Sequence, residues 1–327
     1  MKPWGELTRL GRLRRLHRLA RRALAEYRVP VSRVELITED LNAVYRVRTG
    51  SGDGFVLRVG ATGPIGHDVG QVRCEVTWLQ ALASHTDLAV PVPVPSRSGD
   101  LITEVSDPGV PDARTCVLFE WLPGRTVDGR ITAGSLEAYG RLAAGLHRHA
   151  ARFRFPQACR PLSYDRVFPF DEPVVLFDDG VLSPARRTLF RAAEQLVSEA
   201  IARLRAAEPM RILHGDLHVW NVLVHGGVAA AIDFEDLVMG WPVQDLGIAL
   251  YYLSLRPGYR EMLNAFRRGY EEVAPWPDHT GDEITAFIAG RTLVLANDVE
   301  LLVRAGDEFD RAGFMERAEW RLREILS

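Results

Sequence analysis

The spacing of hydrophobic and polar positions changes along this chain, and each change marks a different kind of structure. Residues 6–27 place leucines and alanines three and four positions apart with arginines between them, which is the pattern of an amphipathic helix. A second helical pattern covers 72–82. Short apolar or alternating runs, typical of β-strands, lie at 34–38, 43–48, 54–59, 103–106 and 115–121. This part of the chain is predicted to be an antiparallel sheet with one helix between its third and fourth strands.

Helical spacing dominates the rest of the chain. The predicted helices are 136–149, 183–207, 243–255, 259–272, 282–304 and 311–326. Two apolar runs, Asn221–Val224 and Val228–Ile232, interrupt this series, and the Gly226-Gly227 pair between them predicts a β-hairpin. The pattern divides the chain into an N-terminal helix (1–29), a small lobe (30–122) and a large lobe (123–327), with a boundary near Leu122-Pro123-Gly124.

Polar side chains gather at one end of the predicted hairpin. Asp216 and Asn221 lie in the loop that enters the hairpin, and Asp233 follows its second strand. Phosphoryl transfer requires this set: a carboxylate to take the proton of an alcohol, and an amide and a second carboxylate to hold Mg²⁺. The sequence therefore predicts a site for phosphorylating a hydroxyl group.

The motif H-G-D-L-H-x-x-N at 214–221, followed by I-D-F-x-D at 232–236, resembles the aminoglycoside phosphotransferase family, the small-molecule relatives of protein kinases. This resemblance implies an α+β, bilobal, protein-kinase-like fold with an antiparallel small lobe and a mainly helical large lobe. It also implies that ATP and Mg²⁺ bind between the lobes, with Asp216 as base and Asn221 and Asp233 as magnesium ligands. The acceptor is then a hydroxyl of a small molecule.

The residue that grips the ATP phosphates departs from the kinase pattern. Lys2 is the only lysine of the chain, so the usual small-lobe lysine is missing. Arg58 stands in its place in Phe55-Val56-Leu57-Arg58-Val59, and several bacterial members of the resembled family also carry arginine there. An arginine binds phosphate through two parallel hydrogen bonds. We expect Arg58 to pair with Glu75 on the 72–82 helix; Arg46 and Arg48 are the competing cations.

The remaining nucleotide contacts follow from the same resemblance. No G-x-G-x-x-G is present, and the corresponding turn is 38–43, where Asn42 is expected to tighten the backbone. The segment 116–124 resembles the hinge, so the carbonyl of Glu120 and the amide of Leu122 are expected to bond adenine. Leu223 and Ile232 are expected to form the apolar floor of the adenine site.

Four polar residues surround the proposed base. His214 is placed in the catalytic loop, where it more often holds the backbone than takes part in the chemistry, and His218 is interpreted as structural. Asp245 resembles a family aspartate that braces the catalytic loop. Asp236 is assigned to the same bracing or to the substrate, and these two roles stay open.

Bulk properties narrow the function. The net charge of −3 and pI of about 6.3 give no general electrostatic case for nucleic acid or an acidic membrane. Three separated cysteines without C-x-x-C, and the lack of an 18-residue apolar run, favour a cytoplasmic protein without a membrane span or cysteine zinc site. The oligomeric state is not indicated.

Other functions compete with this prediction. The missing glycine-rich loop and lysine also fit a nucleotide-binding pseudoenzyme with a regulatory role. A protein Ser/Thr kinase is a lesser alternative, since no activation segment ending in A-P-E is obvious. A metal hydrolase built on His214, Asp216 and His218 would leave Asn221 and Asp233 without a role. The resembled family phosphorylates aminoglycosides, macrolides, choline, homoserine and sugars, and a cationic acceptor is suggested by Asp298, Glu300, Asp307 and Glu308.

Overall fold

The computed structural model describes residues 2–52, 54–62, 67–169, 172–306 and 308–327. Asp307, suggested above for substrate binding, and Asp53, within the predicted turn at 49–54, lie outside the described residues. The chain divides into two compact units. The first comprises Met1–Pro123 and Phe155–Arg160, and the second comprises Gly124–Arg154 and Pro161–Ser327. The roles predicted for the three sequence segments stay predictions.

The first unit contains a five-stranded antiparallel sheet in the order β1-β2-β3-β5-β4. Each strand matches one of the five apolar runs of the sequence, with ends that differ by up to three residues. Irregular register between β1 and β2 accompanies the longest of these extensions. The strands are β1 (Val31–Glu39), β2 (Ala43–Thr49), β3 (Gly54–Val59), β4 (Thr103–Val105) and β5 (Arg114–Glu120).

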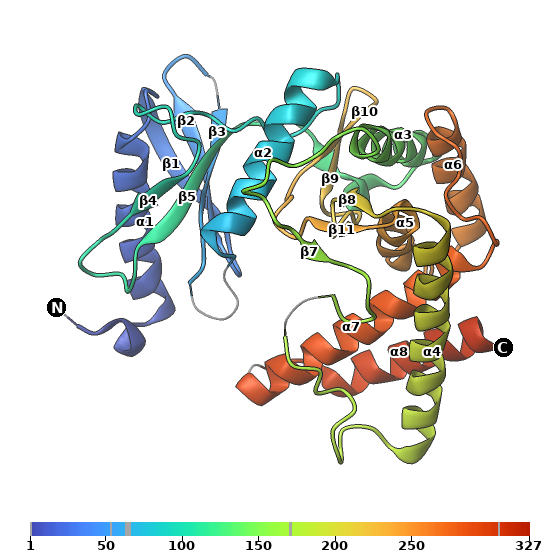
Figure 1. Cartoon of the computed structure of the whole chain (residues 1–327). Coiled ribbons are helices and arrows are strands. Elements are labelled where there is room, and N and C mark those ends of the chain that lie inside the picture. The colour runs from blue at the N-terminus through green and yellow to red at the C-terminus, as the bar shows by residue number, and fades with distance from the viewer. Residues whose placement is uncertain (1, 53, 63–66, 170–171, 307) are drawn as a thin grey trace. The chain divides into compact units, whose positions relative to one another are not determined.

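Helices α1 (Arg9–Ala25) and α2 (Val69–His85) cover opposite faces of this sheet (Figure 1). Leu57 and Val59 of β3 belong to the buried cluster formed with the apolar face of α1. Side chains alternate along a strand, so Arg58 between them points to the face of α2. Thr8 caps the first turn of α1, and an Asp68–Gln71 capping box starts α2.

The second unit is mainly helical. Two small sheets, β10-β9-β6 and β7-β11-β8, carry its loops. The short strands are β6 (Arg125–Thr126), β7 (Leu162–Ser163), β8 (Arg211–Leu213), β9 (Val222–His225), β10 (Val228–Ala231) and β11 (Val238–Gly240). The helices are α3 (Ala133–Ala150), α4 (Pro184–Ala207), α5 (Pro242–Tyr251), α6 (Tyr259–Glu271), α7 (Glu283–Ala305) and α8 (Arg311–Leu326).

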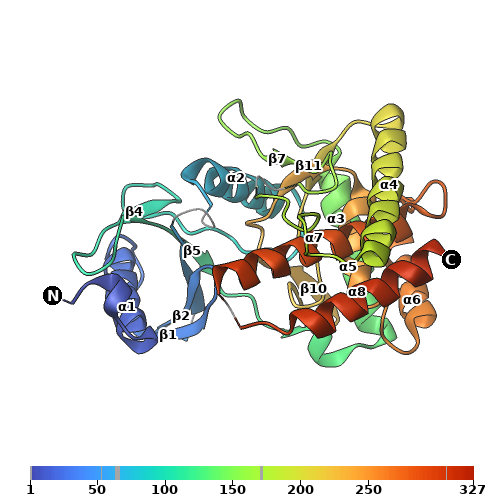
Figure 2. The same ribbon diagram turned by 90° about the horizontal axis from the view of Figure 1, so that it is seen from below.

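Close helix packing fixes the interior of the second unit. Helices α4, α7 and α8 lie side by side (Figure 2). Helices α5 and α7 approach at Gly247, where an added Cβ would lie 2.4 Å from Cβ of Phe287. A larger side chain at 247 would push these helices apart. Within the described part of the chain, no helix combines the length and apolar character required to cross a membrane.

Candidate active site

The loop between β8 and β9 holds the H-G-D-L-H-x-x-N motif, and its backbone bends sharply at Gly215. Gly215 has φ 84°, and an added Cβ would lie 1.9 Å from the carbonyl oxygen of Asp236. Only glycine accepts both this left-handed conformation and this close contact at low cost. The loop is therefore pressed against the segment that follows β10.

Asp245 holds the backbone of this loop from α5. Its carboxylate oxygens accept hydrogen bonds from the amides of His214 and Gly215, both at 3.0 Å, and Nε2 of His147 lies 3.1 Å from Oδ2. Asp245 is fully buried. Burial opposes its ionisation, but His147, His214 and the Gly215 amide outweigh that effect and hold the pKa of Asp245 below its usual value. The contacts are those of the bracing residue that the sequence suggested.

His214 is a buried structural residue. Its Nδ1 lies 3.4 Å from the amide of Asp216 and accepts from it, so the ring proton resides on Nε2, which donates to the carbonyl of Ile232 at 3.0 Å. Burial lowers the pKa of His214 and keeps the ring neutral. Its ring also packs on Phe234, with centroids 4.4 Å apart. Both ring nitrogens thus serve the backbone, which supports the structural interpretation.

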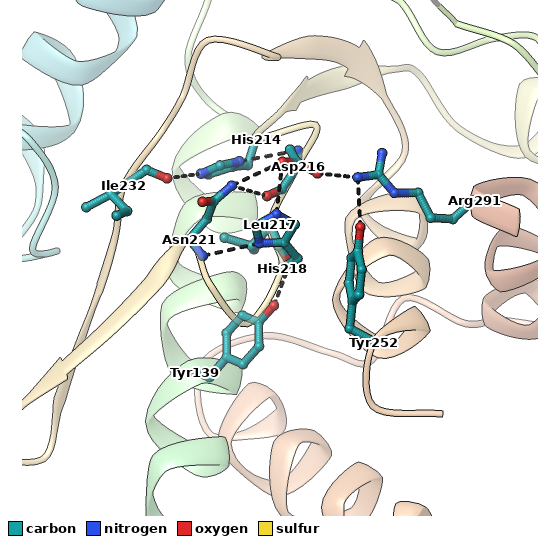
Figure 3. A network of polar contacts seen from close by, with 9 residues as sticks. All are labelled: Tyr139, His214, Asp216, Leu217, His218, Asn221, Ile232, Tyr252 and Arg291. Atoms are coloured by element: carbon teal, nitrogen blue, oxygen red, sulfur yellow. Dashed lines mark hydrogen bonds and ion pairs between the residues drawn. The ribbon is translucent and has the colours of Figure 1, made fainter. Parts of the chain in front are cut away.

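The Asp216 carboxylate sits at the centre of a polar network (Figure 3). Nδ2 of Asn221 donates to the Asp216 carbonyl at 3.0 Å and to Oδ2 at 3.1 Å. Nε2 of His218 lies 3.2 Å from Oδ2, while Nδ1 of His218 accepts from the amide of Asn221. On the other side, Nη2 of Arg291 donates to Oδ1 at 2.6 Å. The structure therefore brings Asp216, His218 and Asn221 together.

Asn221 presents its amide oxygen away from these contacts. Because Nδ2 is directed at Asp216, Oδ1 is left for another partner, and it accepts no hydrogen bond from the residues that the structure describes. Asn221 itself is 8% exposed. An amide oxygen that no described donor reaches is a candidate metal ligand.

The segment after β10 carries three acidic residues. Asp233 is exposed and has φ 66°, a left-handed conformation uncommon for a residue other than glycine. Phe234 is buried next to His214. Burial, followed by the negative charges of Asp216, Glu235 and Asp233, raises the pKa of Asp236 well above its usual value. Asp236 therefore holds a proton more readily than a solvated carboxylate does, whereas Asp233 is open to solvent.

In the first unit, Arg58 and Glu75 form a buried, two-pronged ion pair. Nη1 of Arg58 lies 2.8 Å from Oε1 of Glu75, and Nη2 contacts Oε2. The residues are 8% and 2% exposed. The competing cations have other surroundings: Arg46 lies over the ring of Trp121, and Arg48 pairs with Glu35 at the surface. The contact predicted between Arg58 and Glu75 is present; its role toward ATP stays a prediction.

The other predicted nucleotide contacts lie on both units. Oδ1 of Asn42 accepts from the amide of Ala61 at 2.9 Å, joining the β1–β2 turn to the end of β3. Glu120 ends β5, and its amide donates to Val92. The amide of Leu122 donates no hydrogen bond within the described residues. In the second unit, Leu223 and Ile232 are half-buried at adjacent ends of the β9–β10 hairpin.

Several residues of the site escaped sequence reasoning. Nη2 of Arg291, on α7, donates to Asp216 and to the hydroxyl of Tyr252, which follows α5. His147 of α3 bridges Asp245 and the hydroxyl of Tyr270. Tyr139 of α3 donates to the carbonyl of Leu217. None lies in a recognisable motif; the only signal for Arg291 is a cation within an otherwise apolar helical pattern.

The metal-hydrolase alternative lacks a suitable ligand set. Among the described residues, no group of three His, Cys, Asp or Glu side chains is arranged to hold a metal ion. His214 uses both ring nitrogens on the backbone. The arrangement instead provides one carboxylate surrounded by hydrogen-bond donors, and one amide oxygen beside it.

Sequence comparison shows which known proteins this chain is similar to. Residues 33–276 match the family model described as the phosphotransferase enzyme family. An uncharacterized protein of Synechocystis sp. is 28% identical over 249 residues, 72% of this chain, which spans only 64% of that relative's length. Amicoumacin kinase of Bacillus subtilis is 24% identical over 260 residues, covering 76% of this chain and 74% of that protein.

A solved structure identifies the fold. The amicoumacin kinase hAmiN, in complex with AMP-PNP, Ca²⁺ and Ami, superimposes with a TM-score of 0.76 at 20% identity, over 94% of this chain and 93% of that one. The predicted kinase-like α+β fold is confirmed. The family match covers most of the chain and includes the catalytic loop. This chain belongs to the phosphotransferase enzyme family.

Proposed function

We propose that this protein transfers the γ-phosphoryl group of ATP to a hydroxyl of a small molecule, with Asp216 as the base. The observation that carries the proposal is the Asp216 carboxylate itself, which three side chains hold in place. A fixed carboxylate orients an alcohol and accepts its proton as the phosphorus–oxygen bond forms. The complex of a structural relative with AMP-PNP supports ATP as donor.

The metal would be held by Asn221 and Asp233. The amide oxygen of Asn221 is left unbonded by the described residues, and Asp233 adds an exposed carboxylate at the end of the same hairpin. Mg²⁺ accepts such a pair because it retains waters and shares the phosphate oxygens of its substrate. When bound, the ion would neutralise charge on the transferring phosphoryl group. His214 would keep the loop in register.

The first unit would bind the nucleotide. Arg58 is held as a cation by Glu75 in a buried site, so its guanidinium is oriented before ATP arrives. The Leu122 amide and Glu120 carbonyl would bond adenine. Asn42 would stiffen the turn over the phosphates through Ala61.

The transfer then requires few protein groups. The acceptor oxygen attacks the γ-phosphorus while its proton passes to Asp216. The bond between that phosphorus and the β,γ-bridging oxygen breaks, and its electron pair leaves with ADP. Positioning and charge stabilisation supply most of the rate increase in such reactions.

An acceptor screen tests this function. Purified full-length protein is incubated with Mg·ATP and a panel of hydroxyl compounds, including aminoglycosides, amino alcohols, sugars and amicoumacin, and ADP release is followed. We expect at least one acceptor to raise ADP release, with one phosphate added to it by mass spectrometry. Asp216→Asn should lower turnover by about 10²–10⁴-fold and leave ATP binding intact.

A matched control separates chemistry from folding. Asp179→Asn changes an exposed loop carboxylate and should turn over at the wild-type rate. Retention of full turnover by Asp216→Asn would refute the assignment of the base. Tight ATP binding without any ADP release would favour the pseudoenzyme instead.

A further inference from the structure

Oδ1 of the Asp216 carboxylate has one acceptor position that the described residues leave unused. An ionised carboxylate offers four acceptor positions, two on each oxygen. Asn221 donates one hydrogen bond to Oδ2, and Nε2 of His218 lies 3.2 Å from the same oxygen. Arg291 faces Oδ1, and it is the only side chain that contacts this oxygen in the described part of the chain. One position therefore remains, on Oδ1 beside the guanidinium of Arg291.

The N–H assignment for His218 follows from its second ring nitrogen. Nδ1 accepts the amide of Asn221 at 3.2 Å, so Nε2 carries the proton and faces Oδ2. Oδ2 is thereby flanked by two N–H groups, so Oδ1 is the more open oxygen for an incoming hydroxyl.

Arg291 is set rigidly beside this oxygen. Its side chain is 12% exposed, and Nη2 also donates to the hydroxyl of Tyr252 at 3.3 Å. The close approach of α5 and α7 at Gly247 and Phe287, one turn before Arg291 on α7, fixes the helix that carries it. Figure 3 shows the guanidinium between Asp216 and Tyr252.

Structure alone does not explain an arginine at this position. Nε of Arg291 is buried and has no hydrogen-bond partner among the described residues. A buried ion pair is seldom more stable than apolar residues of similar volume, and an unsatisfied buried donor adds a further cost. The neighbouring residues Leu293 and Val294 of α7 are buried and apolar. An arginine retained here at such a cost indicates a function at Asp216.

We propose that Arg291 is a positioning residue for the phosphoryl transfer: it fixes Asp216 so that the free lone pair of Oδ1 receives the acceptor hydroxyl. This inference rests on the proposed function. The acceptor O–H donates to Oδ1, its proton moves to that oxygen, and the acceptor oxygen forms the bond to the γ-phosphorus as ADP leaves. Arg291 acts through Asp216 and donates no atom to the product.

The test compares variants with an acceptor identified in the screen. Arg291→Met removes the charge and keeps the length of the side chain, and Arg291→Lys keeps a charge without the planar fork. Arg304→Met is the matched control, because Arg304 lies on the same helix but forms an exposed pair with Asp178. We measure kcat, KM for ATP and KM for the acceptor, and verify folding by circular dichroism and thermal unfolding.

We expect Arg291→Met to lower kcat by about 10²-fold, the scale of a misplaced catalytic group, with KM for ATP within about twofold of wild type. The kcat of Arg291→Lys should be about tenfold higher than that of Arg291→Met, and the kcat of Arg304→Met should match that of the wild type. In a protein that already carries Asp216→Asn, adding Arg291→Met should lower the single-turnover rate by less than about threefold. The reason is that the effects of two residues that act as one unit are not additive.

Four results would overturn the inference: wild-type kcat in Arg291→Met, a kcat above wild type, an equal loss in Arg304→Met, or full additivity with Asp216→Asn. If Arg291→Met does not fold, Arg291→Gln replaces it, and wild-type kcat in that variant is decisive against the inference. Wild-type protein that phosphorylates no acceptor overturns the proposed function and the inference with it. Wild-type turnover that persists in the Arg291 variants overturns the inference alone.

Discussion

Nε2 of His147 lies 3.1 Å from Oδ2 of Asp245, and the hydroxyl of Tyr270 lies 2.8 Å from the other ring nitrogen of His147. Helices α3, α5 and α6 thus meet in one buried polar chain. Since Asp245 also accepts the amides of His214 and Gly215, the chain ends at the catalytic loop. The position of that loop depends on three helices that carry none of its motif.

Asp245→Asn should destabilise the protein. An amide has one acceptor oxygen, so it cannot accept from both backbone amides and His147, and an unpaired N–H remains buried. The free energy of unfolding should fall by about 2–3 kcal/mol at pH 7, measured by urea denaturation. The pKa of Asp245 is depressed in the folded protein, so its stabilisation exists above the unfolded pKa and is lost as pH falls through the folded one. The difference between variant and wild type should therefore shrink in acid.

Breaking the ion pair between Arg58 and Glu75 should lower both the stability of the protein and its use of ATP. Arg58→Met leaves Glu75 buried without its counter-ion and should cost about 3–5 kcal/mol; adding Glu75→Met should restore much of this. Arg58→Met and the double variant should both use ATP less well than the wild type, because neither has a cation at position 58. Arg48→Met, which removes an exposed pair with Glu35, is the control. Equal KM values for ATP in Arg58→Met/Glu75→Met and wild type would contradict the role of Arg58.

Gly215 and Gly227 share nearly the same backbone angle, with φ 84° and 83°. An added Cβ at 227 meets nothing within 4 Å, whereas at 215 it meets the Asp236 carbonyl oxygen at 1.9 Å. Gly227→Ala should cost about 1–2 kcal/mol for the left-handed conformation alone. Gly215→Ala should cost clearly more and abolish turnover. Similar melting temperatures for the two variants would show that the contact at 215 relaxes freely.

The contribution of Asp298 to the free energy of unfolding should depend on pH with the opposite sign to that of Asp245. Burial, followed by the negative charge of Glu172, raises the pKa of Asp298 to about 7. The folded state then binds a proton more tightly than the unfolded chain, so this group lowers stability as pH rises from about 4 to 7. Asp298→Asn should gain about 1–3 kcal/mol over wild type at pH 8 and little at pH 4. Urea midpoints at both pH values measure this, and a constant difference would argue against the shift.

Removal of the Asp233 carboxylate should weaken the magnesium-dependent binding of ATP. Mg·ATP should raise the melting temperature of the wild-type protein and have a much smaller effect on Asp233→Ala, because that variant keeps only the amide ligand. ATP with EDTA provides the metal-free comparison. An unchanged melting shift in Asp233→Ala would refute the ligand assignment, and stoichiometric zinc in the purified protein would revive the hydrolase alternative.

Apolar spacing predicted the elements that bury a continuous stripe or face. The five strands of the first unit and the long helices of the second appear close to the predicted positions. The helix expected at 243–255 ends instead at Tyr251, where the backbone enters turns around Leu253. The strands β6, β7, β8 and β11 have two or three residues each, too few to show a period of two.

The site was predictable where residues lie close in sequence or resemble a family motif. Asp216, His218 and Asn221 share one loop, and the contact between Arg58 and Glu75 followed from the resemblance. Arg291 was not predictable, since 75 residues separate it from Asp216 and only the packing of α7 on α5 joins them. His147 likewise has no local signal, because its role depends on Asp245, 98 residues away.

The first unit includes Phe155–Arg160, although the chain on either side of this segment belongs to the second unit. Cys159 in this segment is buried, with its sulfur 3.8 Å from Oγ1 of Thr77 on α2. The polypeptide therefore passes between the units at three junctions, after residues 123, 154 and 160. A fragment ending at Pro123 would lack part of its own interior, so the first unit cannot be expressed intact by simple truncation. A permuted or fused gene that supplies 155–160 would be required to obtain it alone.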